Sequence, residues 1–229
     1  MNIIGKNYKM KNIFADKASL VLRKMFQNPE KRWVVRDFTG PGGVSLGMSQ
    51  EVFEAMEKKG YIERVKKGPS SYTILTNKEK SISDWVKEYS FDQNVIDTYY
   101  SADKNILNKF RKVLKENQYA LTLHTGANLM TSFVKTEEIF IYVNLKDRKK
   151  DILDIRQKLD LKELVRGGNI HLVHPFYKNS VFFNTQKIKD YNVVSNLQLY
   201  LDLYNFQPRG REQAEYLKNL IEERGRNLE

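Results

Sequence analysis

The sequence predicts an α+β protein of two domains, and three observations support this prediction. Residues 15–75 contain three helical stretches followed by two short strands. Residues 119–183 alternate strand-like and helical patterns, which is typical of a mixed α/β domain. Neither periodicity persists around residues 91–102, so we expect a boundary near residue 90. The expected domains are therefore residues 1–90 and 91–229.

The first domain is expected to contain five elements before its exit helix. They are helices over Ala15–Gln27, Trp33–Phe38 and Val44–Lys59, and strands over Tyr61–Val65 and Tyr72–Leu75. In the third helix Val52, Phe53 and Met56 recur at helical spacing, and Ser45 or Ser49 can cap its start. Three helices followed by a hairpin predict a winged helix-turn-helix over residues 15–76. Residues 77–89 predict a further helix that leaves this domain.

This arrangement indicates double-stranded DNA as a partner, because a helix can enter the major groove while a basic hairpin holds phosphates. The expected contacts to bases are Ser45, Met48, Ser49 and Gln50, and those to phosphates are Arg36, Arg64, Lys66, Lys67 and Ser71. Three glutamates further along the helix, Glu51, Glu54 and Glu57, weigh against DNA unless they face away from the groove. A winged helix that serves as a protein-interaction module is therefore a second interpretation.

The distribution of charge favours the DNA interpretation. The chain has a formal net charge of +11, and residues 1–90 hold 17 Lys and Arg against 10 Asp and Glu. Most of the positive excess thus lies in the smaller domain, which contains the basic hairpin.

Composition excludes several other classes. The chain has no cysteine, and therefore no disulfides, thiolate metal ligands or cysteine nucleophiles. It has no apolar run of about 20 residues, as a membrane helix requires. Its first twelve residues are polar and lack the apolar core of a secretory signal, so a cytoplasmic location is expected.

The second domain is expected to be a mixed α/β unit with elements spread along the chain. They are strands over residues 119–124, 139–143, 170–173 and 181–183, and helices over 101–114, 147–159, 195–204 and 211–224, the first of them capped by Ser101. A strand that runs into a turn at Gly126, followed by a second strand, is the layout of nucleotidyltransferases.

Catalysis is nevertheless disfavoured, because the second strand, residues 140–144, carries no carboxylate to hold metal ions. Glu137 and Glu138 are adjacent and would point to opposite faces of a strand. His171 and His174 would also face opposite ways, so we expect neither a metal site nor a cofactor. An active nucleotidyltransferase and a ligand-responsive regulator are the alternatives.

A last cluster surrounds an aspartate within an apolar helix. Asp202 lies among leucines and tyrosines, and a semi-buried carboxylate requires a cationic or multi-donor partner. Arg209 and Arg211 follow a proline turn, and we expect one of them to join Asp202 in a structural clasp between two helices. The cluster expected in this domain is Gly126, Asp202, Arg209, Arg211 and Glu212.

Three stretches resemble the AbiEi-type antitoxins of type IV toxin–antitoxin systems. They are VSLGMSQEVFEAMEKKGYIE at Val44–Glu63, the strand–Gly126–strand block, and SNLQLYLDLYNFQPRGREQAEYL at Ser195–Leu217. The resemblance implies a winged helix joined to a catalytically silent nucleotidyltransferase-like domain. It further implies a repressor that binds its own promoter and opposes a separately encoded nucleotidyltransferase toxin without a stable complex. A lone regulator without a toxin is the other role known among such relatives.

Overall fold

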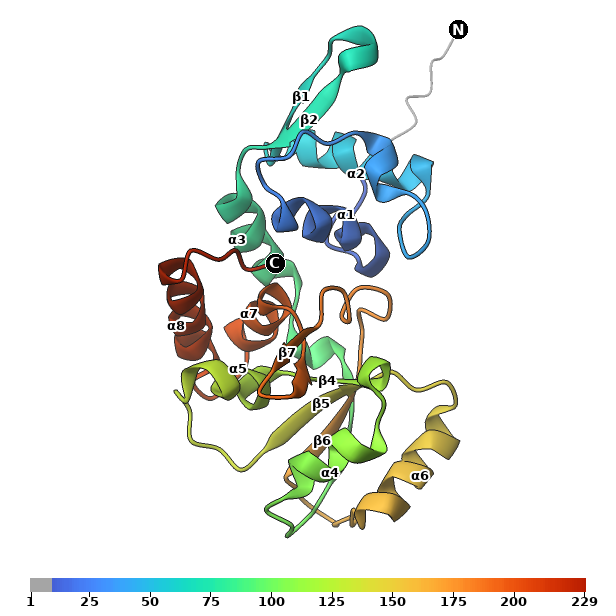
Figure 1. Cartoon of the computed structure of the whole chain (residues 1–229), viewed down its shortest axis with the longest axis vertical. Helices are drawn as coiled ribbons and strands as arrows, with labels where there is room; N and C mark the ends of the chain where they lie inside the picture. Colours follow the sequence, from blue (N-terminus) through green and yellow to red (C-terminus); the bar gives the residue numbers. More distant parts are fainter. Residues whose placement is uncertain (1–9) are drawn as a thin grey trace, which may run out of the picture. The chain divides into compact units, whose positions relative to one another are not determined.

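The computed structural model describes residues 10–229, and the polar segment at residues 1–9 lies outside them. The chain divides into two compact units, Met1–Trp85 and Val86–Glu229, each of which is described by itself. Both units contain helices and a sheet, so the protein is of the α+β class (Figure 1).

The first unit begins with three helical segments: α1 (Asp16–Gln27), the 3₁₀ turn η1 (Val35–Phe38) and α2 (Leu46–Lys58). The helices predicted over 15–27 and 44–59 are confirmed to within two residues. Ser45 caps α2 by accepting a hydrogen bond from the Met48 amide, as one of the two predicted alternatives required. The second predicted helix is a single 3₁₀ turn, because Trp33 is held in a strand-like bridge before it.

A short hairpin follows, formed by β1 (Ile62–Val65) and β2 (Tyr72–Leu75), with the 3₁₀ turn η2 (Gly68–Ser70) between them. Both predicted strands are confirmed, and Val65 pairs with Tyr72 at the end of the ladder. Trp33 exchanges two backbone hydrogen bonds of 2.8 Å with Thr73, which adds a third strand-like segment beside β2. The buried Trp33 ring also packs 5.0 Å from Phe38. The hairpin is thereby anchored to the helical core.

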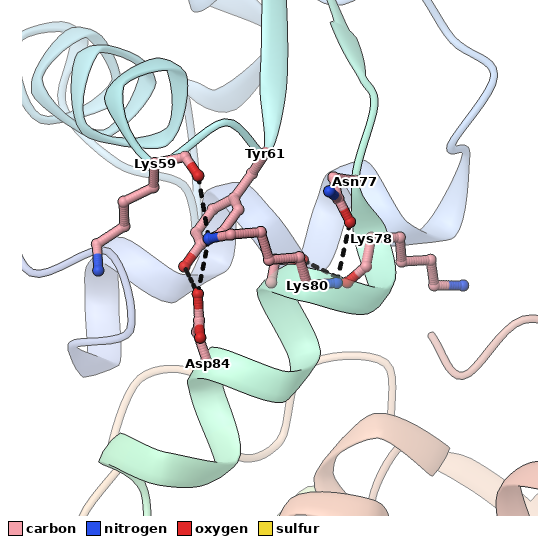
Figure 2. Close-up of polar contacts among 7 residues, drawn as sticks. Lys59, Tyr61, Asn77, Lys78, Lys80 and Asp84 are labelled. Atoms are coloured by element: carbon pink, nitrogen blue, oxygen red, sulfur yellow. Dashed lines mark hydrogen bonds and ion pairs between the residues drawn. The ribbon is translucent and has the colours of Figure 1, made fainter.

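Helix α3 (Lys78–Glu88) follows the hairpin, and side-chain bonds tie its first turns to the elements before it (Figure 2). The Lys80 ammonium donates to the Lys59 carbonyl at 3.1 Å and to the Asp84 carboxylate at 2.9 Å. The Tyr61 hydroxyl donates to the same carboxylate at 2.8 Å. These bonds link α3 to the end of α2 and the start of the hairpin.

The second unit is built on a six-stranded sheet with the order β3-β6-β5-β4-β8-β7. Its strands are β3 (Val95–Tyr99), β4 (Tyr119–Leu121), β5 (Ile139–Val143), β6 (Ile170–His174), β7 (Gln186–Ile188) and β8 (Tyr191–Val193). The β5–β6 and β4–β8 pairs are parallel, and the other pairs are antiparallel.

Helices cover both faces of this sheet. Those near one face are α4 (Ile106–Val113) and α6 (Arg148–Leu159), and those near the other are α5 (Leu123–Thr131), α7 (Asn196–Tyr204) and α8 (Gly210–Glu223) (Figure 1). Two short 3₁₀ turns, η3 (Phe91–Gln93) and η4 (Glu116–Gln118), precede β3 and β4. Phe140 of β5 points toward the α7 side, where its ring lies 5.4 Å from that of Phe206.

Several predictions for this unit were wrong at the level of single elements. Residues 181–183, predicted as a strand, form turns, and Ser101 does not cap α4, which starts after Asn105. Strand β3 was missed because its first four residues are at least partly exposed and include Asp97 and Thr98, so it lacks an apolar pattern.

Gly126 lies inside α5 and not in a turn, which corrects the predicted strand–turn layout. Strand β4 ends at Leu121, and α5 begins at Leu123. A Cβ at Gly126 would lie 3.0 Å from the Leu121 carbonyl and from side-chain carbons of Val193 and Leu199. The glycine therefore permits close packing of α5 against β4, β8 and α7, rather than forming the turn of the predicted nucleotidyltransferase layout.

Candidate nucleic-acid interface and the buried Asp202 network

The start of α2 presents an open surface. Ser45 and Gln50 are exposed and Met48 is half-buried, so these three side chains lie where base contacts were predicted. A Cβ placed at Gly47 would meet no atom within 4 Å. The bare glycine allows another molecule to approach the backbone of this turn closely.

Ser49 does not belong to this surface. Its side chain is fully buried, and its hydroxyl donates to the Val35 carbonyl at 3.0 Å. The predicted base contact is therefore wrong, because the serine faces inward on the helix and joins α2 to η1.

The three glutamates of α2 have nearby polar partners, which reduces the repulsion that their carboxylates would exert on DNA phosphates. Glu51 pairs with Lys11 at 3.1 Å, and Glu57 pairs with Arg64 of the hairpin at 3.5 Å. Glu54 accepts a long 3.4 Å hydrogen bond from Gln50. Two of the three carboxylates thus lie beside a cation. Arg64 is in turn partly neutralised by its ion pair with Glu57.

The hairpin turn exposes two lysines without ion-pair partners among residues 10–229, Lys66 and Lys67. Ser71 instead shapes the turn: its hydroxyl donates to the Gly68 carbonyl at 2.7 Å and accepts from the Lys67 amide at 3.0 Å. Arg36 is exposed on η1. The lysines are therefore the cations best available to a polyanion.

Arg32 is a basic residue of this region that the sequence did not single out. It is exposed, and its guanidinium lies 4.7 Å from the centre of the Tyr72 ring of β2. The backbone pairing of Trp33 with Thr73 brings Arg32 to the hairpin. Trp33 and Thr73 are forty positions apart, and no local sequence pattern indicates a pairing at that separation.

In the second unit, Asp202 is fully buried in a network of neutral hydrogen-bond donors. Its carboxylate accepts from the hydroxyls of Thr122 at 2.5 Å, Tyr89 at 2.7 Å and Tyr142 at 3.1 Å. It also accepts from the Gln198 amide one helical turn earlier, at 2.8 Å. Of the two kinds of partner predicted for Asp202, the described part of the chain therefore has the set of several hydrogen-bond donors and not the cation.

The predicted clasp between Asp202 and an arginine is wrong. Arg209 pairs with Glu212 at 3.1 Å, and Arg211 donates to the Tyr204 hydroxyl at 3.0 Å. Arg209, Arg211 and Glu212 are all exposed, at the N-cap and in the first turn of α8. Because Asp202 faces the sheet, these arginines cannot reach it.

Burial raises the pKa of Asp202 to about 6, although hydrogen bonds from Thr122, Tyr89, Gln198 and Tyr142 favour the charged form. Desolvation also raises the pKa of Tyr89 and that of Tyr142 well above the ordinary tyrosine value, so both hydroxyls keep their protons. The network therefore holds one carboxyl whose charge changes in mildly acidic solution.

This shift predicts how stability depends on pH. Because the pKa of Asp202 is higher in the folded than in the unfolded chain, its contribution to the free energy of unfolding falls as pH rises from about 4 to about 6. One pKa unit is worth about 1.4 kcal/mol, so the fall from this group is roughly 3 kcal/mol. Urea unfolding of the wild type and of Asp202→Asn should show that the difference between their free energies of unfolding changes with pH in this window. A difference that stays constant, as expected for Asp154→Asn on the surface, would contradict the shift.

The histidines have structural partners. His171 contacts Thr98 at 3.1 Å and His174 contacts Asp97 at 2.8 Å, on opposite faces of β6 as predicted. His124 bonds to Gln213 of α8 and to the Pro208 carbonyl at 3.2 Å. Among residues 10–229, no three His, Asp or Glu side chains are grouped as a metal site requires.

A helix with an exposed start, followed by a basic hairpin and joined to a second α+β unit, is typical of regulatory proteins that contact nucleic acid. The family model described as "Transcriptional regulator, AbiEi antitoxin, Type IV TA system" matches residues 74–223, about two thirds of the chain. The chain therefore belongs to the AbiEi antitoxin family of transcriptional regulators, which confirms the resemblance found in the sequence. Neither the comparison with curated proteins nor that with solved structures gave a match. None of the described helices is long and apolar enough to cross a membrane.

Proposed function

We propose that this antitoxin-family regulator binds double-stranded DNA at its own promoter through the first unit, as a winged helix-turn-helix. The proposal rests mainly on one observation: Lys66 and Lys67 are exposed at the turn of the hairpin that follows α2, a helix whose own start is exposed at Ser45 and Gln50. Helix α2 would enter the major groove with Ser45, Met48 and Gln50 near the bases. The lysines, with Arg36, Arg32 and part of Arg64, would hold phosphates.

We expect the double variant Lys66→Ala and Lys67→Ala to bind all DNA sequences about tenfold more weakly at moderate salt. Each phosphate contact contributes roughly 0.9 to the slope of log affinity against log salt, so losing two flattens this slope by nearly 2. Fluorescence anisotropy with the chain's own promoter DNA and with random DNA, over a series of salt concentrations, measures both effects.

The matched control is Lys149→Ala with Lys150→Ala, an equally exposed lysine pair on α6 in the second unit. It removes the same charge, so unchanged binding by this control separates a local contact from a loss of net charge. Equal weakening in the two double variants would refute the role of the hairpin. Absence of DNA binding by the wild type at low salt would favour the protein-interaction module instead.

For the second unit, we propose a nucleotidyltransferase-like domain without catalytic activity, which opposes a separately encoded nucleotidyltransferase toxin without a stable complex. Three observations support the absence of catalysis. Strand β5 contains no carboxylate, Glu138 lies 3.3 Å from His171, and Asp202, beside the junction of β4 and α5, is fully buried among neutral donors. A carboxyl in that position cannot reach a metal ion bound at the surface.

A further inference from the structure

A cavity of about 600 Å³ lies in the second unit, apart from the Asp202 network. Its lining includes Asn144 and Leu145, which follow β5, and Phe176 and Lys178, which follow β6. Because β5 and β6 are parallel neighbours, their carboxyl ends open into the same space. The crevice at the carboxyl ends of parallel strands is the usual place for a ligand in α/β sheets, and this volume is within the range of small-molecule sites.

Part of the cavity lining is polar and includes Arg148 and His174. Behind them, Asp97 accepts from Arg148 at 2.7 Å and from His174 at 2.8 Å. Burial opposes ionisation of Asp97, but the hydrogen bonds from Arg148 and His174 outweigh it and lower the pKa of this carboxyl. For His174 burial acts in the other direction and lowers the pKa, because the charged form of a histidine is the protonated one. Its neutral ring must therefore carry the proton on Nε2, facing the carboxylate.

This arrangement leaves positive charge available to a ligand. Arg148 directs Nε and one Nη at Asp97, and its other Nη has no hydrogen bond within residues 10–229. The Asp97 and Arg148 charges offset each other, and a neutral His174 adds none. Lys178 is exposed, lines the cavity and has no carboxylate partner in the described part of the chain. Its ammonium is therefore the uncompensated charge of the site.

Another part of the lining is apolar and accessible. Phe176 is 49% exposed, and one face of its ring stacks on Tyr177 with the centroids 5.6 Å apart. Val95 at the start of the edge strand β3 is 53% exposed and lines the same space. An exposed ring held from behind by a second ring is a suitable platform for stacking a planar group.

We propose that this cavity binds a small molecule that carries a phosphate on a planar heterocycle, a nucleoside monophosphate being the simplest case. Lys178 and the remaining Nη of Arg148 hold the phosphate, and Phe176 stacks against the base. The proposal does not depend on DNA binding, because every residue that carries it lies in the second unit.

The test is isothermal titration calorimetry of the full chain with AMP, GMP, CMP and UMP, and separately with adenosine and inorganic phosphate. At least one nucleotide should bind, and more tightly than adenosine or phosphate. Lys178→Ala should weaken nucleotide binding at least tenfold and leave adenosine binding unchanged. Phe176→Ala should weaken the binding of both nucleotide and adenosine. Both side chains are exposed, so neither change should prevent folding.

The control is Lys104→Ala, which removes an exposed lysine outside the cavity and should bind nucleotide as the wild type does. No binding of any of the four nucleotides at millimolar concentration would overturn the proposal, as would equal affinity in wild type and both cavity variants. In the absence of nucleotide, Lys178→Ala should keep wild-type affinity for promoter DNA. A failure of the nucleotide proposal can therefore be distinguished from a failure of the DNA proposal.

Discussion

Replacing Asp202 by alanine is expected to lower the free energy of unfolding of the second unit by about 3–5 kcal/mol. The change leaves the donors of Thr122, Tyr89, Tyr142 and Gln198 without their shared acceptor in a fully buried place. Each unsatisfied donor costs roughly 1–3 kcal/mol. Removing a desolvated carboxyl recovers part of this sum, because burial already disfavours its charge.

Hydrogen–deuterium exchange with peptide resolution measures this effect where it arises. Amides of β5 and α7 should exchange faster in Asp202→Ala, whereas amides of α2 in the first unit should keep wild-type rates. The matched control is Asp154→Ala on the exposed face of α6, which should change stability by less than about 0.5 kcal/mol. If Asp202→Ala were as stable as this control, the network would not contribute to the fold.

Replacing Gly126 by valine is expected to destabilise the second unit by about 2–3 kcal/mol, although valine favours a helix slightly over glycine. The new Cβ would meet the Leu121 carbonyl and two side-chain carbons, each at 3.0 Å, and the two methyl groups would need further space. One of these neighbours is backbone, which cannot rotate away. Strand β4 would therefore have to separate from α5.

Gly47→Val is the matched control, because Gly47 also lies within an α-helix and its Cβ direction is open. Urea unfolding followed by far-UV circular dichroism should show a clear loss for Gly126→Val and a change below about 1 kcal/mol for Gly47→Val. Similar values for the two variants would show that helix propensity, and not packing, determines the role of Gly126.

The elements of the first unit could be predicted because their signals are local. A serine cap, apolar residues at helical spacing and a glycine after Lys59 define α2 within a short window. The resemblance to the AbiEi family likewise came from continuous stretches, and the family model confirms it. Exposure of Lys66 and Lys67 follows from the same hairpin pattern.

Burial and long-range partners could not be predicted in this way. Ser49 and Gln50 are adjacent polar residues, and only the packing of η1 against α2 buries the first of them. Strand β3 has no apolar pattern of its own and exists because β6 supplies its hydrogen bonds. The cavity beside Arg148 arises where segments that follow β5 and β6 meet.

The sequence alone determined the α+β class, the hairpin with its exposed cations, the acid-free strand at residues 139–143 and the family. Each of these depends on residue types and short spacings, which act over one or two turns of helix or one strand. The tertiary structure decided that Gly126 is a packing residue, that Asp202 bonds to neutral donors and that Arg209 and Arg211 face away from it. These outcomes depend on which side chains meet across the sheet, and desolvation and close packing act between residues far apart in the chain.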